Sequence, residues 1–145
     1  MRETGVNYAG QCHCGALEFQ YQTGVLPTSW PVRGCQCSFC RIHAGLSTSD
    51  PAGSLAFQTL QSGALQRYRF GSQTADFLIC RICGVYVGAI CAGAPGRFGI
   101  INVRALRPFP QGLPASTSMH YDDESPTERL SRRAARWTAL RADSL

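Results

Sequence analysis

Seven of the eight cysteines fall into three short groups, and their spacing constrains this chain more than any other feature. The groups follow one another along the sequence as Cys12 and Cys14, then Cys35, Cys37 and Cys40, then Cys80 and Cys83. Cysteines clustered in this way are typical metal ligands in a reducing compartment, and typical disulfide partners in secreted proteins. The first ten residues contain no apolar leader. We therefore expect a cytoplasmic protein whose cysteines bind metal.

Length and charge narrow the class further. A chain of 145 residues predicts one compact domain. The formal net charge of +5 comes mainly from arginines, many of them near the C-terminus, and such a local excess permits nucleic-acid binding without requiring it. The longest apolar run, Val85–Cys91, is shorter than a bilayer span, so we expect no membrane partner.

The sequence predicts a mainly β chain. Leu17, Phe19 and Tyr21 alternate with polar residues, which is the pattern of a strand with one buried face. Other short apolar stretches are separated by turn residues. We therefore expect mainly antiparallel strands over residues 16–22, 55–60, 64–70, 75–79, 85–90 and 98–103. The proline-rich segment 107–114 is expected to be an extended surface connector, and residues 41–47 a short helical turn.

One longer helix is predicted near the C-terminus. Ser125 is a capping serine, Pro126 takes the first helical position, and Glu128 completes a capping box. One face of this helix carries Leu130, Ala134 and Trp137, and the other carries Arg129, Arg132, Arg133 and Arg136. We expect the helix to dock through Trp137 and its arginine face to be solvated, and we favour this over an anion-binding role.

Ligand counting suggests two zinc sites. Zinc takes four protein ligands in a structural site, and three in a site that keeps an exchangeable position. If the two pairs meet, they form a closed site from Cys12, Cys14, Cys80 and Cys83. The triplet of Cys35, Cys37 and Cys40 would then hold a second zinc with one position open. A substrate thiol suits that position, because the metal would deprotonate it.

The spacing also permits other arrangements. A ribbon-type site could form from two adjacent pairs, Cys37 with Cys40 and Cys80 with Cys83. Alternatively, His13 or His43 could fill the fourth place at the triplet and close both sites, whereas His120 is a weaker candidate. Cys91 lies on one face of a predicted strand and is expected to be a small buried residue.

The cysteine groups resemble the signature of the CENP-V/GFA family, which is named for a centromere protein and for the glutathione-dependent formaldehyde-activating enzyme. The matching pieces stand in the family's order: Gly10-x-Cys12-x-Cys14-Gly15, Cys35-x-Cys37-Ser38-x-Cys40-Arg41, Cys80-x-x-Cys83-Gly84, and Asn102 followed by Leu106. The resemblance extends over residues 5–110, and the arginine-rich C-terminal helix is not part of it.

This resemblance implies a β-tent type of zinc-binding fold over residues 5–110. Residues 111–145 then form a connector and a basic amphipathic helix packed on the same domain. The resemblance also implies a structural zinc on the paired cysteines and a catalytic zinc on the triplet, and hence two zinc ions per chain. The reaction implied is condensation of formaldehyde with the thiol of glutathione, formally a carbon–sulfur lyase reaction run in the synthetic direction.

Two functional hypotheses follow. The first is a zinc-dependent carbon–sulfur lyase that acts on the adduct of a small aldehyde with a thiol such as glutathione. The second is a non-catalytic zinc module whose arginine helix binds an acidic partner or nucleic acid. Arg33, Arg41 and Arg81 lie near the cysteine groups and could meet the carboxylates of glutathione, but the sequence assigns them no role.

Overall fold

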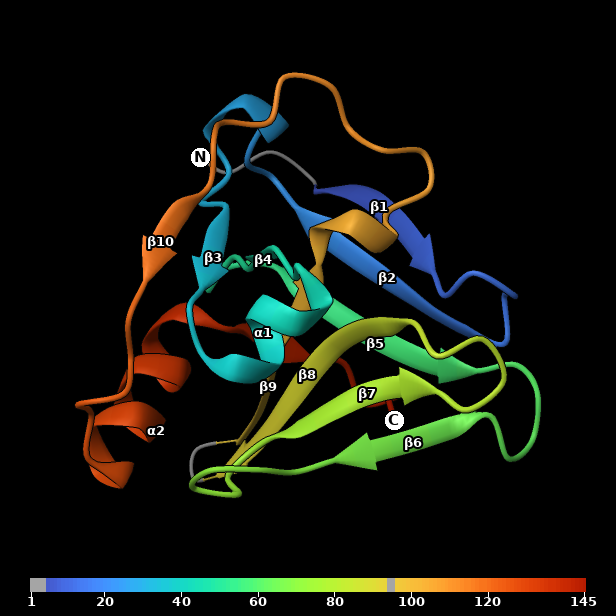
Figure 1. Cartoon of the computed structure of the whole chain (residues 1–145). Coiled ribbons are helices and arrows are strands. Elements are labelled where there is room, and N and C mark those ends of the chain that lie inside the picture. The colour runs from blue at the N-terminus through green and yellow to red at the C-terminus, as the bar shows by residue number, and fades with distance from the viewer. Residues whose placement is uncertain (1–4, 94–95) are drawn as a thin grey trace.

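The computed structural model describes residues 5–93 and 96–145, and it confirms a mainly β chain (Figure 1). Within these residues the strands are β1 Val6–Gln11, β2 Leu17–Thr23, β3 Arg33–Cys35, β4 Ser47–Thr48, β5 Ser54–Thr59, β6 Leu65–Tyr68, β7 Asp76–Cys80, β8 Tyr86–Gly93, β9 Gly96–Asn102, β10 Thr117–Met119 and β11 Thr138–Leu140. The helices are α1 Ser38–His43 and α2 Pro126–Arg136, with 3₁₀ turns at Pro27–Ser29 and Val103–Ala105. Neither helix of this described part is long and apolar enough to cross a membrane.

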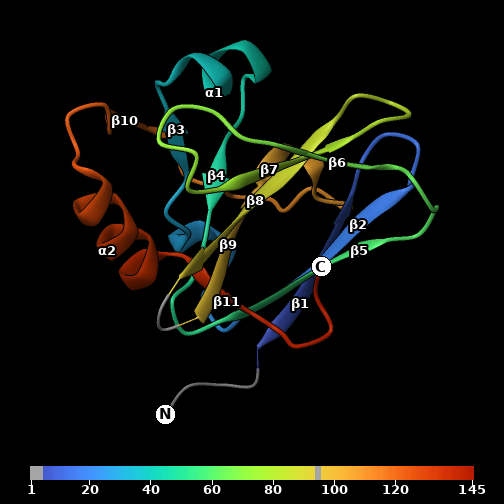
Figure 2. The same cartoon turned by 90° about the horizontal axis from the view of Figure 1, so that it is seen from below.

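The strands form one branched sheet. Pairing runs β1-β2-β5-β11-β9-β4-β3-β10, and β9 also pairs with β8, which continues into β7 and β6. Most pairs are antiparallel, as predicted, while β10 with β3 and β11 with β5 are parallel. Figures 1 and 2 both place α2 and β10 on the side of the molecule away from β2. The C-terminal region thus packs on the same sheet as the cysteine-bearing strands.

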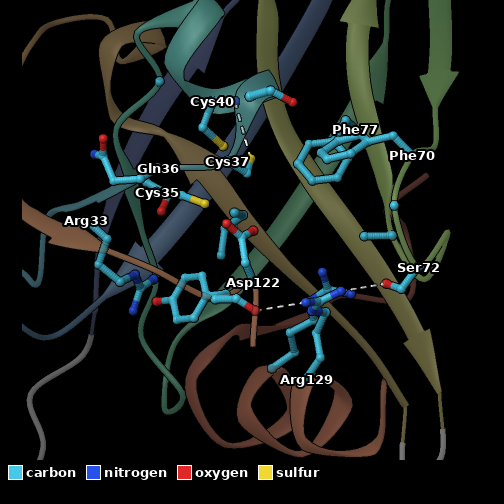
Figure 3. A pocket seen from close by; sticks show the side chains of 18 of the residues that line it. Arg33, Cys35, Gln36, Cys37, Cys40, Phe70, Ser72, Phe77, Asp122 and Arg129 are labelled. Atoms are coloured by element: carbon cyan, nitrogen blue, oxygen red, sulfur yellow. Dashed lines mark hydrogen bonds between the residues drawn. The ribbon is translucent and has the colours of Figure 1, made fainter. Parts of the chain in front are cut away.

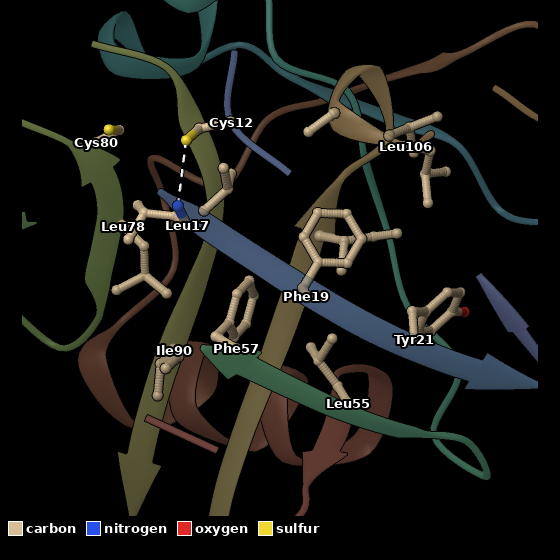
Figure 4. Close-up of a cluster of buried hydrophobic side chains, with 14 of the residues drawn as sticks. Cys12, Leu17, Phe19, Tyr21, Leu55, Phe57, Leu78, Cys80, Ile90 and Leu106 are labelled. Atoms are coloured by element: carbon tan, nitrogen blue, oxygen red, sulfur yellow. Dashed lines mark hydrogen bonds between the residues drawn. The ribbon is translucent and has the colours of Figure 1, made fainter. Parts of the chain in front are cut away.

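The main core lies where β2, β5 and β8 meet (Figure 4). The alternation predicted for residues 16–22 is confirmed, because Leu17, Phe19 and Tyr21 are all buried. Phe19 meets Phe57 of β5 edge to face, with ring centroids 5.8 Å apart. Cys12 belongs to the same core cluster, so the first cysteine group is anchored directly to the packed interior.

Several short elements were not predicted. β3, β10 and β11 have three residues each, which is too short for a readable alternation. Strand β1 begins at Val6, in a stretch without a clear pattern. The helical turn expected at 41–47 begins earlier, since α1 starts at Ser38 and ends before Ala44, whose φ of 51° is left-handed.

Gly88 of β8 tests the packing of this sheet. A Cβ placed there would overlap the carbonyl oxygen of Ile100 and lie 2.6 Å from Cζ of Phe57. We expect Gly88→Ala to lower the free energy of unfolding by about 1–3 kcal/mol, because neither the β9 backbone nor the buried ring can retreat freely. The matched control is Gly93→Ala in the same strand, where a Cβ would meet nothing within 4 Å. Urea denaturation of the metal-loaded proteins measures both, and equal stabilities would contradict the packing.

Candidate metal centre

The first cysteine cluster joins two hairpins that are distant in sequence. Its four sulfurs lie within 4.8 Å of one another. Cys12 and Cys14 lie in the turn between β1 and β2, whereas Cys80 ends β7 and Cys83 lies in the turn before β8. The Sγ atom of Cys14 lies 3.7 Å from that of Cys12 and 3.6 Å from that of Cys80. The two pairs therefore meet, as the ligand count suggested.

Local backbone geometry turns these sulfurs toward a common point. The amide of Leu17 donates to Sγ of Cys12 at 3.3 Å (Figure 4), and the amide of Ile82 donates to Sγ of Cys80 at 3.4 Å. Each turn also contains a glycine with positive φ, 84° at Gly15 and 79° at Gly84, a conformation that other residues rarely adopt. Amide donors of this kind favour the thiolate form of cysteine.

The second cluster is built on α1. Cys35 ends β3, Cys37 is the N-cap of α1, and Cys40 lies within the helix. Their three sulfurs also lie within 4.8 Å of one another. The amide of Cys40 donates to Sγ of Cys37 at 3.5 Å (Figure 3), so the Cys37 side chain takes the capping role that serine or aspartate often fills.

The three thiols of this triplet cannot all ionise by themselves. Hydrogen bonds from the thiols of Cys35 and Cys40 hold the pKa of Cys37 far below its ordinary value. The same contacts raise the pKa of Cys40, and the hydrogen bond with Cys37 raises that of Cys35. Neighbouring like charges oppose one another. A bound cation is therefore the species that would let all three ionise together.

The structure decides between the arrangements that the spacing left open. All eight cysteines are free thiols, so no disulfide joins them. The ribbon-type site is not formed, because Cys80 and Cys83 group with the N-terminal pair. Neither His13 nor His43 belongs to either cluster of described ligand atoms, and the ring of His43 packs instead on Phe39, with centroids 4.4 Å apart. Cys91 is buried, as predicted.

The triplet opens into a cavity of about 730 Å³ (Figure 3). One part of its wall is aromatic and apolar, with Phe70, Phe77, Tyr86, Ile100 and Trp137. Burial, reinforced by the charges of the nearby cysteines, raises the pKa of Tyr86 well above its ordinary value, so this residue stays protonated. The four-cysteine cluster contributes no residue to this cavity. A small molecule in the cavity can therefore reach the triplet but not the four-cysteine cluster.

Comparison with known proteins places this geometry in a family. The model of the GFA family, described as glutathione-dependent formaldehyde-activating enzyme, matches residues 7–119. The chain belongs to the GFA family. It is also similar to a protein of known crystal structure from Rhodobacter sphaeroides, with 26% sequence identity and a TM-score of 0.55. That similarity covers 77% of this chain and 99% of the other.

The GFA match includes all seven clustered cysteines and ends at Met119, the last residue of β10. β10 pairs with β3, so Met119 lies opposite Cys35 of the triplet, and the amide of Gln36 donates to the carbonyl of Met119 at 2.9 Å. Everything that follows, including α2, lies outside the match. The segment beyond the matched residues therefore continues from a strand that lies directly beside the triplet.

The arginine face of α2 corrects a prediction. Trp137 is buried, as expected, but the arginines do not simply face water. Arg129, Arg132 and Arg133 line the cavity that holds the triplet, and Arg133 is only 8% exposed. Leu130, expected on the packed face, is 39% exposed. Helical periodicity showed that these arginines share a face, but it could not show that this face packs inward.

Two of these arginines are held by one carboxylate. Nε of Arg132 lies 2.7 Å from Oε2 of Glu124, and Nε of Arg129 lies 3.4 Å from Oε1. The hydrogen bond from Arg132 lowers the pKa of Glu124, and the Arg132 guanidinium stacks 3.5 Å from the ring centroid of Tyr121. Arg129 also donates to Ser72 (Figure 3). These contacts hold the N-terminal half of α2 against the cavity.

The cavity also contains residues to which the sequence assigned no role. Arg33 and Arg41, which were considered but not assigned, both line it, whereas Arg81 does not. Asp122 was not considered as a site residue at all and lies in the cavity wall (Figure 3). The proximity of Arg33 and Arg41 to the triplet in sequence was a usable signal, but Asp122 is separated from it by most of the chain.

The capping box of α2 is confirmed, and it positions the arginines. The Ser125 hydroxyl accepts from the Glu128 amide at 3.1 Å, and the Glu128 carboxylate accepts from the Ser125 amide at 2.9 Å. We expect Ser125→Ala to lower the free energy of unfolding by about 1 kcal/mol, because helix amides lose their acceptor. Ser131→Ala, at an exposed position of the same helix, is the matched control and should be neutral or slightly stabilising. Denaturant unfolding measures the pair, and an unchanged Ser125→Ala midpoint would contradict the role of the cap.

Proposed function

We propose that this GFA family member is a zinc-dependent enzyme that joins a thiol to a small aldehyde, formally a carbon–sulfur lyase working in the synthetic direction. The observation that carries the proposal is the pair of unequal cysteine clusters. Four sulfurs form a group away from the cavity, whereas three form a group that opens into it. Glutathione, named in the description of the matching family, is the first thiol to test, and formaldehyde the first aldehyde.

The donor sets fit zinc. Thiolate sulfur is a soft ligand that zinc accepts in sites of four cysteines. Cys12, Cys14, Cys80 and Cys83 would hold a structural ion, and Cys35, Cys37 and Cys40 would hold a second one. Within the described residues no histidine, aspartate or glutamate completes the triplet group, so three protein ligands leave one position for a substrate atom.

Zinc at the triplet, when bound, supplies a cation that favours the thiolate form of an incoming thiol at neutral pH. The chain supplies the rest of the site. Phe70, Phe77 and Ile100 form an apolar wall that limits water beside the triplet. The neutral Tyr86 in the same wall offers a hydroxyl that can donate to a carbonyl oxygen, because its raised pKa keeps the proton in place.

The proposed reaction balances without a further reactant. The thiol sulfur attacks the aldehyde carbon and forms the carbon–sulfur bond, while the carbonyl π bond breaks. The proton lost by the thiol ends on the former carbonyl oxygen, which becomes a hydroxyl group. Holding the two reactants together in a confined cavity lowers the barrier, because their encounter no longer has to be made in solution.

The competing hypothesis of a nucleic-acid module finds no support in the position of α2. A helix that binds nucleic acid presents its basic side chains to the outside. Here Arg129, Arg132 and Arg133 line the cavity instead, and Arg136 alone of the four is left exposed on this helix. We therefore favour the enzyme.

Exchange NMR tests the proposed reaction. A catalyst of this reaction speeds the exchange between free glutathione and its formaldehyde adduct, and exchange NMR measures that rate. We expect the zinc-loaded protein to accelerate exchange, and Cys37→Ser to abolish the acceleration while reducing the metal content from two zinc ions to one. Cys91→Ala, which removes a buried thiol outside both clusters, should retain both ions and is the control for metal content.

The same variants show how the proposal would fail. If Cys37→Ser kept two ions and full acceleration, the triplet would not be the reactive site. If it unfolded, as judged by circular dichroism, the triplet would serve to stabilise the fold. No acceleration by the two-zinc protein with any thiol and aldehyde of a panel would remove the proposed activity.

A further inference from the structure

The cavity beside the triplet is strongly basic. Five arginines line it, against a single carboxylate among its lining residues, that of Asp122. The arginines come from separate parts of the chain: Arg33, Arg41, Arg129, Arg132 and Arg133. Glu124 neutralises part of the charge of Arg129 and Arg132. The remaining positive charge lies on Arg33, Arg41 and Arg133, for which the described residues provide no carboxylate partner.

Arg133 is held by uncharged groups, and its guanidinium lies over the ring of Trp137, 4.9 Å from the ring centroid. Only 8% of the residue is exposed, and it makes no ion pair in the described part of the chain. Its Nη1 donates to the hydroxyl of Thr74 at 2.7 Å and approaches Sγ of Cys91 at 3.8 Å. Its Nε is buried without any hydrogen-bond acceptor. Buried polar donors are normally satisfied, so this guanidinium is short of an acceptor.

Arg33 is in a related position. Its Nη2 donates to the hydroxyl of Ser49, and no carboxylate among the described residues pairs with it. Arg33 is half-buried and Arg133 is buried, yet guanidinium groups stay charged in proteins. Two partly desolvated positive charges therefore face one cavity, and an anion in that cavity would stabilise both.

We propose that α2 completes an anion-binding subsite, in which Arg133 and Arg33 bind carboxylate groups of the thiol substrate. The inference rests on the proposed function, since the thiol end of the same molecule would lie at the triplet. It also goes beyond that function, because Arg133 lies outside the residues matched by the family. The subsite would make this chain selective for acidic thiols over neutral ones.

The arginines could also favour thiol binding in a second way, without contacting a carboxylate. The arginines could act only through the field they exert on the triplet, favouring any thiolate that binds there. In that case every thiol would benefit equally, whether or not it carries a carboxylate. A carboxylate subsite instead helps the acidic thiol and leaves the neutral thiol unaffected. Glutathione and its diethyl ester form a suitable pair, because esterification removes both carboxylate charges and keeps the thiol.

The first arm of the test measures anion binding without a thiol. The probe is the peptide γ-Glu-Ala-Gly, which has the carboxylates of glutathione and a methyl side chain in place of the thiol-bearing side chain of cysteine. We expect calorimetry to detect binding to the zinc-loaded protein, weakened about tenfold or more by Arg133→Met and by Arg33→Met, as the loss of a charged hydrogen-bond partner predicts. Arg136→Met removes the same charge from an exposed position of α2 that does not line the cavity, and should change binding less than about twofold.

The second arm measures thiol binding in the cobalt-substituted protein, from the sulfur-to-cobalt charge-transfer band. We expect glutathione to bind about tenfold or more tightly than its diethyl ester, and Arg133→Met to remove this preference by weakening glutathione alone. The comparison of the two thiols needs no variant, so it holds even if Arg133→Met fails to fold.

The outcomes separate the subsite from the proposed function. Equal affinity of the wild-type protein for glutathione and its ester, with a clear change in the band, would overturn the subsite and leave the function standing. Equal weakening of both thiols by Arg133→Met would also overturn it, in favour of the field explanation. No change in the band with either thiol, together with Arg133-dependent binding of γ-Glu-Ala-Gly, would support the subsite and overturn the proposed role of the triplet.

Discussion

Mutual repulsion between crowded thiolates is the constraint on which the rest of this structure depends. Seven sulfurs lie in two groups, each within 4.8 Å, and at such separations a second and third negative charge are strongly disfavoured unless a cation offsets them. In the triplet, hydrogen bonds with the neighbouring thiols lower the pKa of Cys37, and the same contacts raise that of Cys40, with repulsion between the thiolates adding to this rise. Metal binding at these groups would therefore be linked to folding, because the sheet brings the cysteines together.

The two clusters lie in different surroundings, and the proposed reaction depends on this difference. The four-cysteine group connects the β1–β2 and β7–β8 turns and is continuous with the core through Cys12 and Cys80. The triplet instead lies on the short helix α1, at the wall of a cavity that the C-terminal segment closes from another side. The pairing of β10 with β3 brings this segment next to the triplet. In the proposed function, the four-cysteine group would hold a saturated ion that stabilises the fold, and the triplet would hold an unsaturated ion for a substrate.

Local patterns foresaw a large part of this arrangement, and the remainder depends on long-range packing. The alternation around Phe19 and the capping box at Ser125 are short-range signals, and both are confirmed. The two sulfur groups follow from ligand counting, although spacing alone also allowed a ribbon-type site. The inward position of Arg133 had no such signal, because helical periodicity identifies a shared face and not its neighbour. The pairing of β11 between β5 and β9 likewise joins residues far apart in sequence.

Anomalous diffraction at the zinc absorption edge tests the central claim most directly, because it locates each ion separately in a crystal of the zinc-loaded protein. The account predicts two anomalous peaks, one surrounded by the sulfurs of Cys12, Cys14, Cys80 and Cys83. The other should contact Cys35, Cys37 and Cys40 and a fourth ligand that does not belong to the chain, which a soaked thiol replaces. A missing peak at the triplet, or a protein side chain fixed in that fourth position with the thiol present, would contradict it.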